Sequence, residues 1–227
     1  ELYGLRSVDT FIVGSSTYAI GVSWAGDGVQ IINISDPTNI VATDAETEGM
    51  NGFAELGSAR GVSTFTVGLN TYAIVNDHSG IQVIDISDPT NIVATDAETD
   101  GANGFTELNG ARDVATFTIG SSTYAIVAGH VDSGIQIINV SDPANIVATD
   151  AETDGVNGFT ELYRPVGVTT FTIGSDAYAI VTSTYDDGVQ IIQLSDNVGD
   201  VSPPAVPDVV PGVVYNVMTA LSSEQVT

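Results

Sequence analysis

Short apolar runs separated by polar turns follow one another along almost the whole chain. In one representative stretch, β-forming residues occupy positions 111–119, 123–128, 135–140 and 145–150. The second and third runs are nearly continuous apolar segments, which is typical of strands covered on both faces of a sheet. The fourth run is shorter and more polar, as expected for an edge strand. Because no apolar period of 3.6 residues runs for a useful length, the pattern predicts four antiparallel strands.

This pattern occurs four times along the chain. The phrase at 134–143 has counterparts at 28–37, 80–89 and 188–197, and a second shared phrase, Tyr-Ala-Ile, begins at Tyr18, Tyr72, Tyr124 and Tyr178. Successive tyrosines are 54, 52 and 54 residues apart, which indicates one supersecondary unit per repeat. A β-helix would need shorter units of roughly 20–30 residues. We therefore predict an all-β fold, a β-propeller of four four-stranded antiparallel blades or a part of a larger propeller.

The fourth copy is incomplete, and this divides the chain into two parts. Residues 1–196 are predicted to form the four-repeat propeller as one domain, whereas residues 197–227 form a tail rich in Pro and Val. Asn197 stands where the other copies have proline, and no fourth-strand sequence follows it. Within the tail, residues 213–218 have the composition of one strand. We expect this strand to close blade four, because an exposed edge is costly; the alternative is that it adds to an edge of a neighbouring molecule.

The repeated phrases resemble those of a known family. Tyr-Ala-Ile followed by Gly-(Ile/Val)-Gln-(Ile/Val)-Ile-(Asn/Asp)-(Ile/Val)-Ser-Asp-Pro is similar to the repeats of the LVIVD-repeat β-propeller family, over about residues 5–196. The resemblance implies a propeller typical of cell-surface or secreted bacterial and archaeal proteins. It supplies no established catalytic motif that could be transferred to these positions, and the fourth copy departs from the family pattern at Asn197.

The charge balance of the chain is extreme. The 227 residues include 29 acidic and four basic ones, all four of them arginine, for a formal net charge of −25. Nucleic acid and anionic membranes would repel such a chain, and no apolar run approaches the roughly 18 residues that span a bilayer, so we expect neither nucleic-acid binding nor membrane insertion. The alternative explanation of the acidic composition is that it keeps the protein soluble. The chain begins at Glu1 and not at Met, so we predict a processed product or fragment. Its composition, rich in Thr, Ser, Asn and Asp and free of lysine, favours a location outside the cell or on its surface.

The linkers between blades carry a regular pattern of carboxylates. In residues 150–161, acidic residues fall at the first, third, fifth and twelfth positions with glycine at the sixth, which is the ligand spacing of a twelve-residue calcium loop. The three linkers therefore predict calcium as a cofactor. The predicted ligands are Asp44, Glu46, Glu48 and Glu55, then Asp96, Glu98, Asp100 and Glu107, then Asp150, Glu152, Asp154 and Glu161. Strands flank each linker and the eighth position is Asn, so a solvated acidic turn is the alternative.

The four arginines are informative because they are so few. Arg6, Arg60 and Arg112 stand at the start of the innermost strand of their blades, near the linkers, and Arg164 is displaced from that register. We expect structural ion pairs with the linker carboxylates, since guanidinium and carboxylate groups form bidentate pairs. The alternative is a ring of arginines that captures an anion at the mouth of the central channel.

The loops between the second and third strands differ from copy to copy, and we expect them to share one face with the linkers. Exposed aromatic rings beside carboxylates would suit stacking on a sugar or contact with a protein, and drift in unconstrained loops is the alternative. The candidate residues for ligand or partner binding are Trp24, Asp27, Asp77, His78, His130, Asp132, Tyr185 and Asp186. No catalytic residue is predicted, because two histidines alone form neither a metal site nor a triad.

These observations favour a non-enzymatic extracellular β-propeller that serves as a structural or adhesive module of a cell-surface or filamentous assembly. Its predicted partners are other copies of itself or other surface proteins. The alternative is a carbohydrate- or ligand-binding propeller, similar to a lectin, that binds glycans with its acidic linkers and loops.

Overall fold

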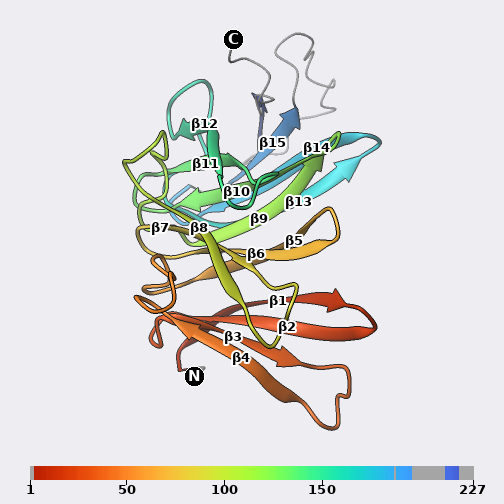
Figure 1. The fold of residues 1–227 in the computed structure, drawn as a ribbon. Helices are drawn as coiled ribbons and strands as arrows, with labels where there is room; N and C mark the ends of the chain where they lie inside the picture. The colour runs from red at the N-terminus through yellow and green to blue at the C-terminus, as the bar shows by residue number, and fades with distance from the viewer. Residues whose placement is uncertain (1–2, 187, 196–212, 220–227) are drawn as a thin grey trace.

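The computed structural model describes residues 3–186, 188–195 and 213–219, which form sixteen strands in four sheets (Figure 1). The first sheet contains β1 (Leu5–Val13), β2 (Ser16–Ser23), β3 (Gly28–Asn33) and β4 (Val41–Thr47). The second contains β5 (Gly61–Val67), β6 (Asn70–Asn76), β7 (Gly80–Asp85) and β8 (Val93–Thr99). The third contains β9 (Asp113–Ile119), β10 (Ser122–Gly129), β11 (Gly134–Asn139) and β12 (Val147–Thr153). The fourth contains β13 (Pro165–Ile173), β14 (Asp176–Ser183), β15 (Val189–Ser195) and β16 (Val213–Thr219).

The predicted all-β class and the four four-stranded sheets are confirmed, and strand order within each sheet follows the chain. Pairing is antiparallel throughout the first three sheets. In the fourth, however, β16 runs parallel to β15, where the sequence predicts antiparallel pairing. Parallel neighbours need a connection of a dozen or more residues that returns the chain to the start of the strand. Residues 196–212 supply that length, and the predicted tail apart from β16 lies outside the described residues.

The four sheets follow one another in chain order, from the red first sheet to the blue fourth sheet (Figure 1). Their innermost strands are in contact in sequence, β1 with β5, β5 with β9 and β9 with β13. Among the described residues, no comparable contact joins the first sheet to the fourth. In this part of the chain the sheets therefore form a propeller-like series with two free ends. The same residues include no helix long and apolar enough to span a membrane.

Three hydrophobic clusters fill the three junctions between neighbouring sheets. At the first junction, Phe11 and Ile20 of the first sheet pack with Val62 and Ile84 of the second. The linker between these sheets adds Phe53, which is 1% exposed. The other two linkers bury their equivalent residues, Phe105 and Phe159. Because each inner sheet faces two such clusters, its central strands must be apolar on both faces, and this explains their continuous apolar runs.

Each sheet also carries one stacked aromatic pair on its first hairpin. The Phe and Tyr of each pair lie directly opposite each other on the first and second strands. Their ring centres are 5.4–5.6 Å apart in Phe11–Tyr18, Phe65–Tyr72, Phe117–Tyr124 and Phe171–Tyr178. Cross-strand aromatic pairs stabilise sheets, so the tyrosine that marks the repeat is a structural residue.

Each linker begins inside the fourth strand of its sheet. β12 includes the first four residues of the segment 150–161. The sequence predicts that this strand ends at residue 150. The chain then turns at Asn157 and Gly158, both with positive φ of 51° and 84°, and the N–H of Phe159 donates to the carbonyl of Val156 at 2.8 Å. Positive φ at both central positions defines a type I′ turn, which Asn-Gly adopts readily. Most residues of this segment, whose sequence resembles a calcium loop, therefore belong to a strand or to a tight turn.

Candidate ligand-binding site at the loop face

The linkers and the loops between the second and third strands lie at one end of the sheets, which we call the loop face (Figure 1). Three of the predicted ligand-binding aspartates join these two kinds of segment. The bonds run from Ser58 N to Asp27 Oδ1 at 2.8 Å, from Asn109 N to Asp132 Oδ2 at 2.8 Å, and from Tyr163 N to Asp186 Oδ2 at 2.7 Å. These carboxylates therefore hold the loops against the linkers.

Four residues, one from each repeat, line a cavity of about 220 Å³ at the loop face, which we call the arginine pocket. They are Arg6, Arg60, Arg112 and Val166. Each stands two positions before an equivalent valine of the innermost strand, so all four occupy the same place in their repeats. The innermost strands therefore converge at this end and bring three of the four arginines of the chain together.

Within the arginine pocket, the guanidinium groups crowd one another. The Arg60 Nη1 donates to the carbonyl of Gly110 at 3.3 Å. Burial lowers the pKa of Arg60, and the positive charges of Arg112 and Arg6 lower it further, whereas Asp77 raises it. The carboxylate of Asp77 is itself buried and accepts bonds from its own loop. A bound anion would relieve this crowding of positive charge.

Aromatic rings contact arginines at the loop face in the first and fourth repeats. The guanidinium of Arg6 lies 5.2 Å from the centre of the Trp24 ring, and that of Arg164 lies 5.5 Å from the centre of the Tyr185 ring. Tyr163 is tilted against Tyr185 at 5.6 Å. All three rings are partly exposed, at 41% for Trp24, 64% for Tyr185 and 44% for Tyr163. The stacked guanidinium groups restrain rings that still present surface to solvent.

Arg164 does not occupy the place of the other three arginines. It has a positive φ of 58° and stands two residues before Val166, which takes the equivalent position in the arginine pocket. Tyr163 was not among the predicted site residues. Its signal in the sequence is that a bulky aromatic residue stands directly before this displaced arginine, where the other linkers carry small or polar residues.

The two histidines of the chain have different surroundings. His130 is buried, and its Nδ1 lies 3.2 Å from the carbonyl of Pro165. Burial lowers the pKa of His130, and the positive charges of Arg112 and Arg164 lower it further. The ring therefore lies near Arg112 of the arginine pocket and near Arg164. His78 is exposed, and its backbone carbonyl accepts a bond from Gly110 N. The His130 ring is therefore buried near Arg112 and Arg164, whereas the His78 ring is exposed.

The linker carboxylates accept hydrogen bonds that join neighbouring repeats or close the linker itself. The first acidic residue of two linkers bonds to the next repeat, Asp44 to Ile92 N at 2.7 Å and Asp96 to Ile146 N at 2.8 Å. The second bonds to the Asn of the type I′ turn, in the pairs Glu46–Asn51, Glu98–Asn103 and Glu152–Asn157. The third bonds to a backbone amide, in the pairs Glu48–Leu56, Asp100–Leu108 and Asp154–Leu162.

In two of the three linkers, the last acidic residue accepts a hydrogen bond from the following sheet. Glu55 accepts a bond from Thr99 Oγ1 at 2.5 Å, and Glu107 accepts one from Thr153 Oγ1 at 2.6 Å. Glu161 has partners of its own, and its backbone carbonyl accepts a bond from Ser183. In the part of the chain that the structure describes, no three His or carboxylate side chains gather as a metal site requires. Calcium binding stays a prediction.

Glu107 is the most perturbed of these carboxyls. It is 8% exposed, and its Oε2 has no hydrogen-bond partner among the described residues. Burial raises its pKa to about 7, the bond from Thr153 opposes this, and the negative charges of Asp132 and Asp100 add to it. Glu107 therefore holds its proton far longer on titration than an exposed carboxyl does.

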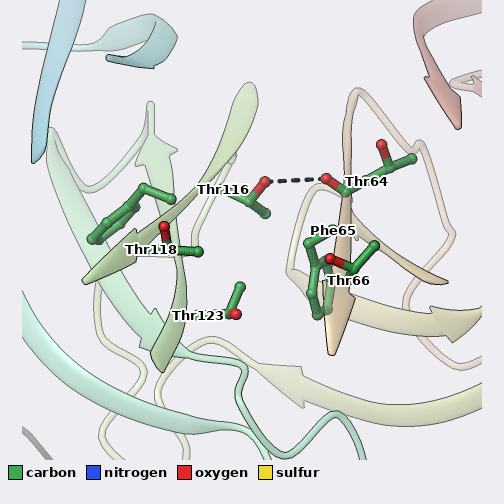
Figure 2. Close-up of a pocket in the computed structure, with 7 residues that line it drawn as sticks. Thr64, Phe65, Thr66, Thr116, Thr118 and Thr123 are labelled. Atoms are coloured by element: carbon green, nitrogen blue, oxygen red, sulfur yellow. Dashed lines mark hydrogen bonds between the residues drawn. The ribbon is translucent and has the colours of Figure 1, made fainter. Parts of the chain in front are cut away.

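Two grooves between neighbouring innermost strands are lined by threonine. One has a volume of about 300 Å³ and lies between β5 and β9, and the other has about 230 Å³ and lies between β9 and β13. Figure 2 shows the first groove, where Thr116 Oγ1 donates to the carbonyl of Thr64 at 3.2 Å. Sequence reasoning missed these grooves, although the repeated Thr-Phe-Thr of the innermost strands was their signal.

Sequence comparison identifies no relatives of this chain. No family model matches it, and no curated protein is similar to it in sequence. The resemblance to LVIVD repeats therefore stays a prediction.

Comparison with solved structures identifies proteins with a similar arrangement of sheets. A family 117 glycoside hydrolase from Zobellia galactanivorans has a TM-score of 0.56 at 8% identity, covering 84% of this chain and 69% of that one. An α-L-arabinofuranosidase from Clostridium thermocellum has a TM-score of 0.54 at 14% identity, covering 85% and 69%. A family 32 β-fructofuranosidase from Bombyx mori has a TM-score of 0.51 at 9% identity, covering 84% of this chain and 45% of that one. At such identities the likeness shows the fold alone.

The comparison corrects two predictions made from the sequence. Several solved structures that share this fold are described as glycoside hydrolases, and the prediction of a structural or adhesive module is therefore wrong. For the same reason the fold gives no ground for excluding an enzyme. The sequence lacked a recognisable catalytic motif, but a propeller-like fold places functional residues on loops from different repeats, where no local motif records them. The alternative prediction, a carbohydrate-binding protein, has the better support.

Proposed function

We propose that this protein, a propeller-like series of four blades, binds a carbohydrate carrying acidic groups at its loop face. The arginine pocket holds an acidic substituent, and the exposed rings beside it contact the sugar. The observation that carries this proposal is the convergence of Arg6, Arg60 and Arg112 from three separate repeats on one cavity.

Local positive charge can attract an anion although the whole chain is strongly acidic. At physiological ionic strength the Debye length is about 8 Å, so most of the 29 acidic side chains are screened from the pocket. The three guanidinium groups act directly on a group bound between them and donate charge-assisted hydrogen bonds to it. The carboxylate of Asp77, which acts on Arg60, already accepts backbone amide bonds. The net negative charge of the chain therefore opposes the long-range attraction of an anionic ligand. Direct contact between an acidic group and the three guanidinium groups remains favourable.

The exposed rings supply what the pocket lacks for sugar recognition. Trp24 and Tyr185 offer flat apolar surfaces with polar edges, and such surfaces suit the apolar face of a sugar ring. Ligand sites typically combine an apolar surface with a few charged or polar groups that fix orientation. The description of several proteins of similar fold as glycoside hydrolases agrees with a carbohydrate ligand.

Titration calorimetry with three polysaccharides tests this function. The probes are a polygalacturonate, a sulfated galactan and an uncharged galactan. We expect the two charged polymers to bind and the uncharged one to bind far more weakly, and the stronger of the two identifies the preferred acidic group. Increasing salt should weaken binding, because the pocket recognises charge. Release of reducing ends, measured in the same samples, shows whether recognition is followed by cleavage.

Variants assign the binding to the pocket. Arg6→Gln combined with Arg112→Gln should weaken binding at least about tenfold, since each change removes a charged donor worth about 1.5–3 kcal/mol. The double change Thr66→Glu with Thr118→Glu is the matched control, because it lowers the net charge equally at exposed positions in the threonine-rich part of two innermost strands, β5 and β9. Equal binding of charged and uncharged polymers, or equal losses in both variants, would contradict the proposal.

A further inference from the structure

Equivalent valines near the start of the four innermost strands differ in exposure. Val62, Val114 and Val168 are 6%, 4% and 7% exposed, because each packs in the cluster that joins its sheet to the preceding one. Val8 occupies the same position in the first sheet and is 59% exposed. The residue type is the same in all four repeats, so the difference comes from the absence, among the described residues, of a neighbouring sheet on that side of the first sheet.

The rest of the first sheet shows the same contrast on that face. Ile40 is 62% exposed, whereas its equivalents Ile92 and Ile146 are each 4% exposed in the first and second junctions. Ile32 and Ile34 are half-buried. Their equivalents in the next two sheets, Ile84, Ile86, Ile138 and Val140, are 0% exposed. The free face of the first sheet thus carries the side chains of a sheet-on-sheet junction.

The fourth sheet presents the complementary half of such a junction. Val13, Val67 and Ile119 end the innermost strands of the first three sheets and pack, partly buried, against the sheet that follows. Their equivalent in the fourth sheet, Ile173, is 61% exposed. Ile180 is likewise half-buried, where its equivalents Ile20, Ile74 and Ile126 are 0% exposed.

We infer that the free face of the first sheet is a docking surface for a second copy of this chain, which seats the free face of its fourth sheet on it. Each of the three internal junctions joins these same two faces, and the residues that form them recur in all four repeats. The chain therefore carries both halves of an interface whose geometry it already uses three times. Because the two faces are different surfaces, the contact is head-to-tail and not between identical patches.

Sedimentation velocity of the full chain over a range of concentrations tests whether copies associate. We expect species heavier than the 23.4 kDa monomer at high concentration. Val8→Asp should abolish them without lowering the melting temperature, since Val8 is largely exposed. Leu69→Asp is the matched control, because Leu69 is fully exposed on the hairpin of the second sheet, and this variant should associate as the parent does. A parent chain that stays monomeric throughout overturns the inference.

Mixing two variants tests the head-to-tail arrangement. Val8→Asp spoils the first face and Ile173→Asp spoils the other, so each variant alone should be monomeric. Their mixture retains one intact face of each kind and should form a dimer with one copy of each variant. Association of Ile173→Asp alone would show contact between identical faces and overturn the arrangement, as would a mixture that remains monomeric. Both substituted positions are largely exposed, so the variants are expected to fold, and circular dichroism checks this.

Discussion

The three linkers and the four loops between second and third strands lie at the same end of the molecule but differ in how closely they follow the repeat. The linkers repeat almost without change, and nearly every linker carboxylate accepts a hydrogen bond that closes the linker or joins it to the next sheet. The loops differ, and they carry Trp24 and Tyr185, whose rings remain partly exposed beside arginines. Repetition at this end marks residues that build junctions, whereas departure from the repeat marks residues that are available to a ligand.

The largest expected effect comes from removing an apolar side chain of a linker. Phe105→Ala should lower the free energy of unfolding by about 3–5 kcal/mol, because Phe105 is 1% exposed within the second junction. Tyr185→Ala, in a loop, should change it by less than about 0.5 kcal/mol. Urea unfolding monitored by circular dichroism measures both. Similar losses in the two variants would remove the distinction between linker and loop.

A smaller effect is expected from a linker carboxylate. Asp96 accepts one amide bond on each oxygen, from Ala97 and from Ile146 of the next repeat, and Asn can accept only one of them. Asp96→Asn should therefore cost about 1–3 kcal/mol in urea unfolding. Asp142→Asn is the matched control at an exposed turn, where a bond from Ala144 needs one oxygen only. A neutral result at Asp96 would show that the junction does not depend on the charge.

The pH dependence of stability should reveal Glu107. Its pKa of about 7 in the folded protein lies above the ordinary 4.5, so the folded protein keeps a proton that the unfolded chain releases between these values. This contribution is fully present below pH 4.5 and is lost as pH rises through 7. Glu107→Gln should therefore raise the melting temperature at pH 8, by about 2–4 °C for each kcal/mol gained. Thr153→Val, which removes the bond that lowers this pKa, should move the transition to higher pH, and unchanged profiles in both variants would contradict the assignment.

The smallest effect is expected from calcium. Linker carboxylates that already accept backbone and Asn donors would have to exchange these bonds for metal coordination, and calcium needs six to eight oxygens. Calcium bound by the linkers should therefore raise the melting temperature by less than the changes above, and differential scanning calorimetry in millimolar calcium measures this. A clear rise would show that the linkers rearrange around the ion. The linkers, like the loops, would then carry residues that are available to a ligand.

The repeat made most of the fold predictable, because strand periodicity and turn sequences are local properties. The direction of β16 was not predictable, since parallel pairing with β15 depends on where a long connection returns the chain. The linker was ambiguous for a related reason. A pattern such as Asp-x-Glu-x-Asp-Gly is compatible with a cation or with backbone amides as partners, and three-dimensional neighbours such as Ile92 decide between them.

The candidate site was predictable in part. Trp24, Tyr185 and the unusual arginines were recognisable as departures from the repeat or from the composition. The roles of Asp27 and Asp132 as ties between loop and linker were not, because the backbone amides they accept from belong to other segments. The exposure of Val8 was equally invisible, since its sequence context matches that of its buried equivalents.

Three separate hydrophobic clusters, each shared by two neighbouring sheets, also determine how the molecule comes apart. When each unit touches only its neighbours, stability is approximately a sum of unit and junction terms, and partial opening becomes possible. The end sheets have one junction each and the middle sheets have two. Amide hydrogens of β6 and β10 should accordingly exchange with solvent more slowly than those of β2 and β14, and opening should begin at the two ends of the series.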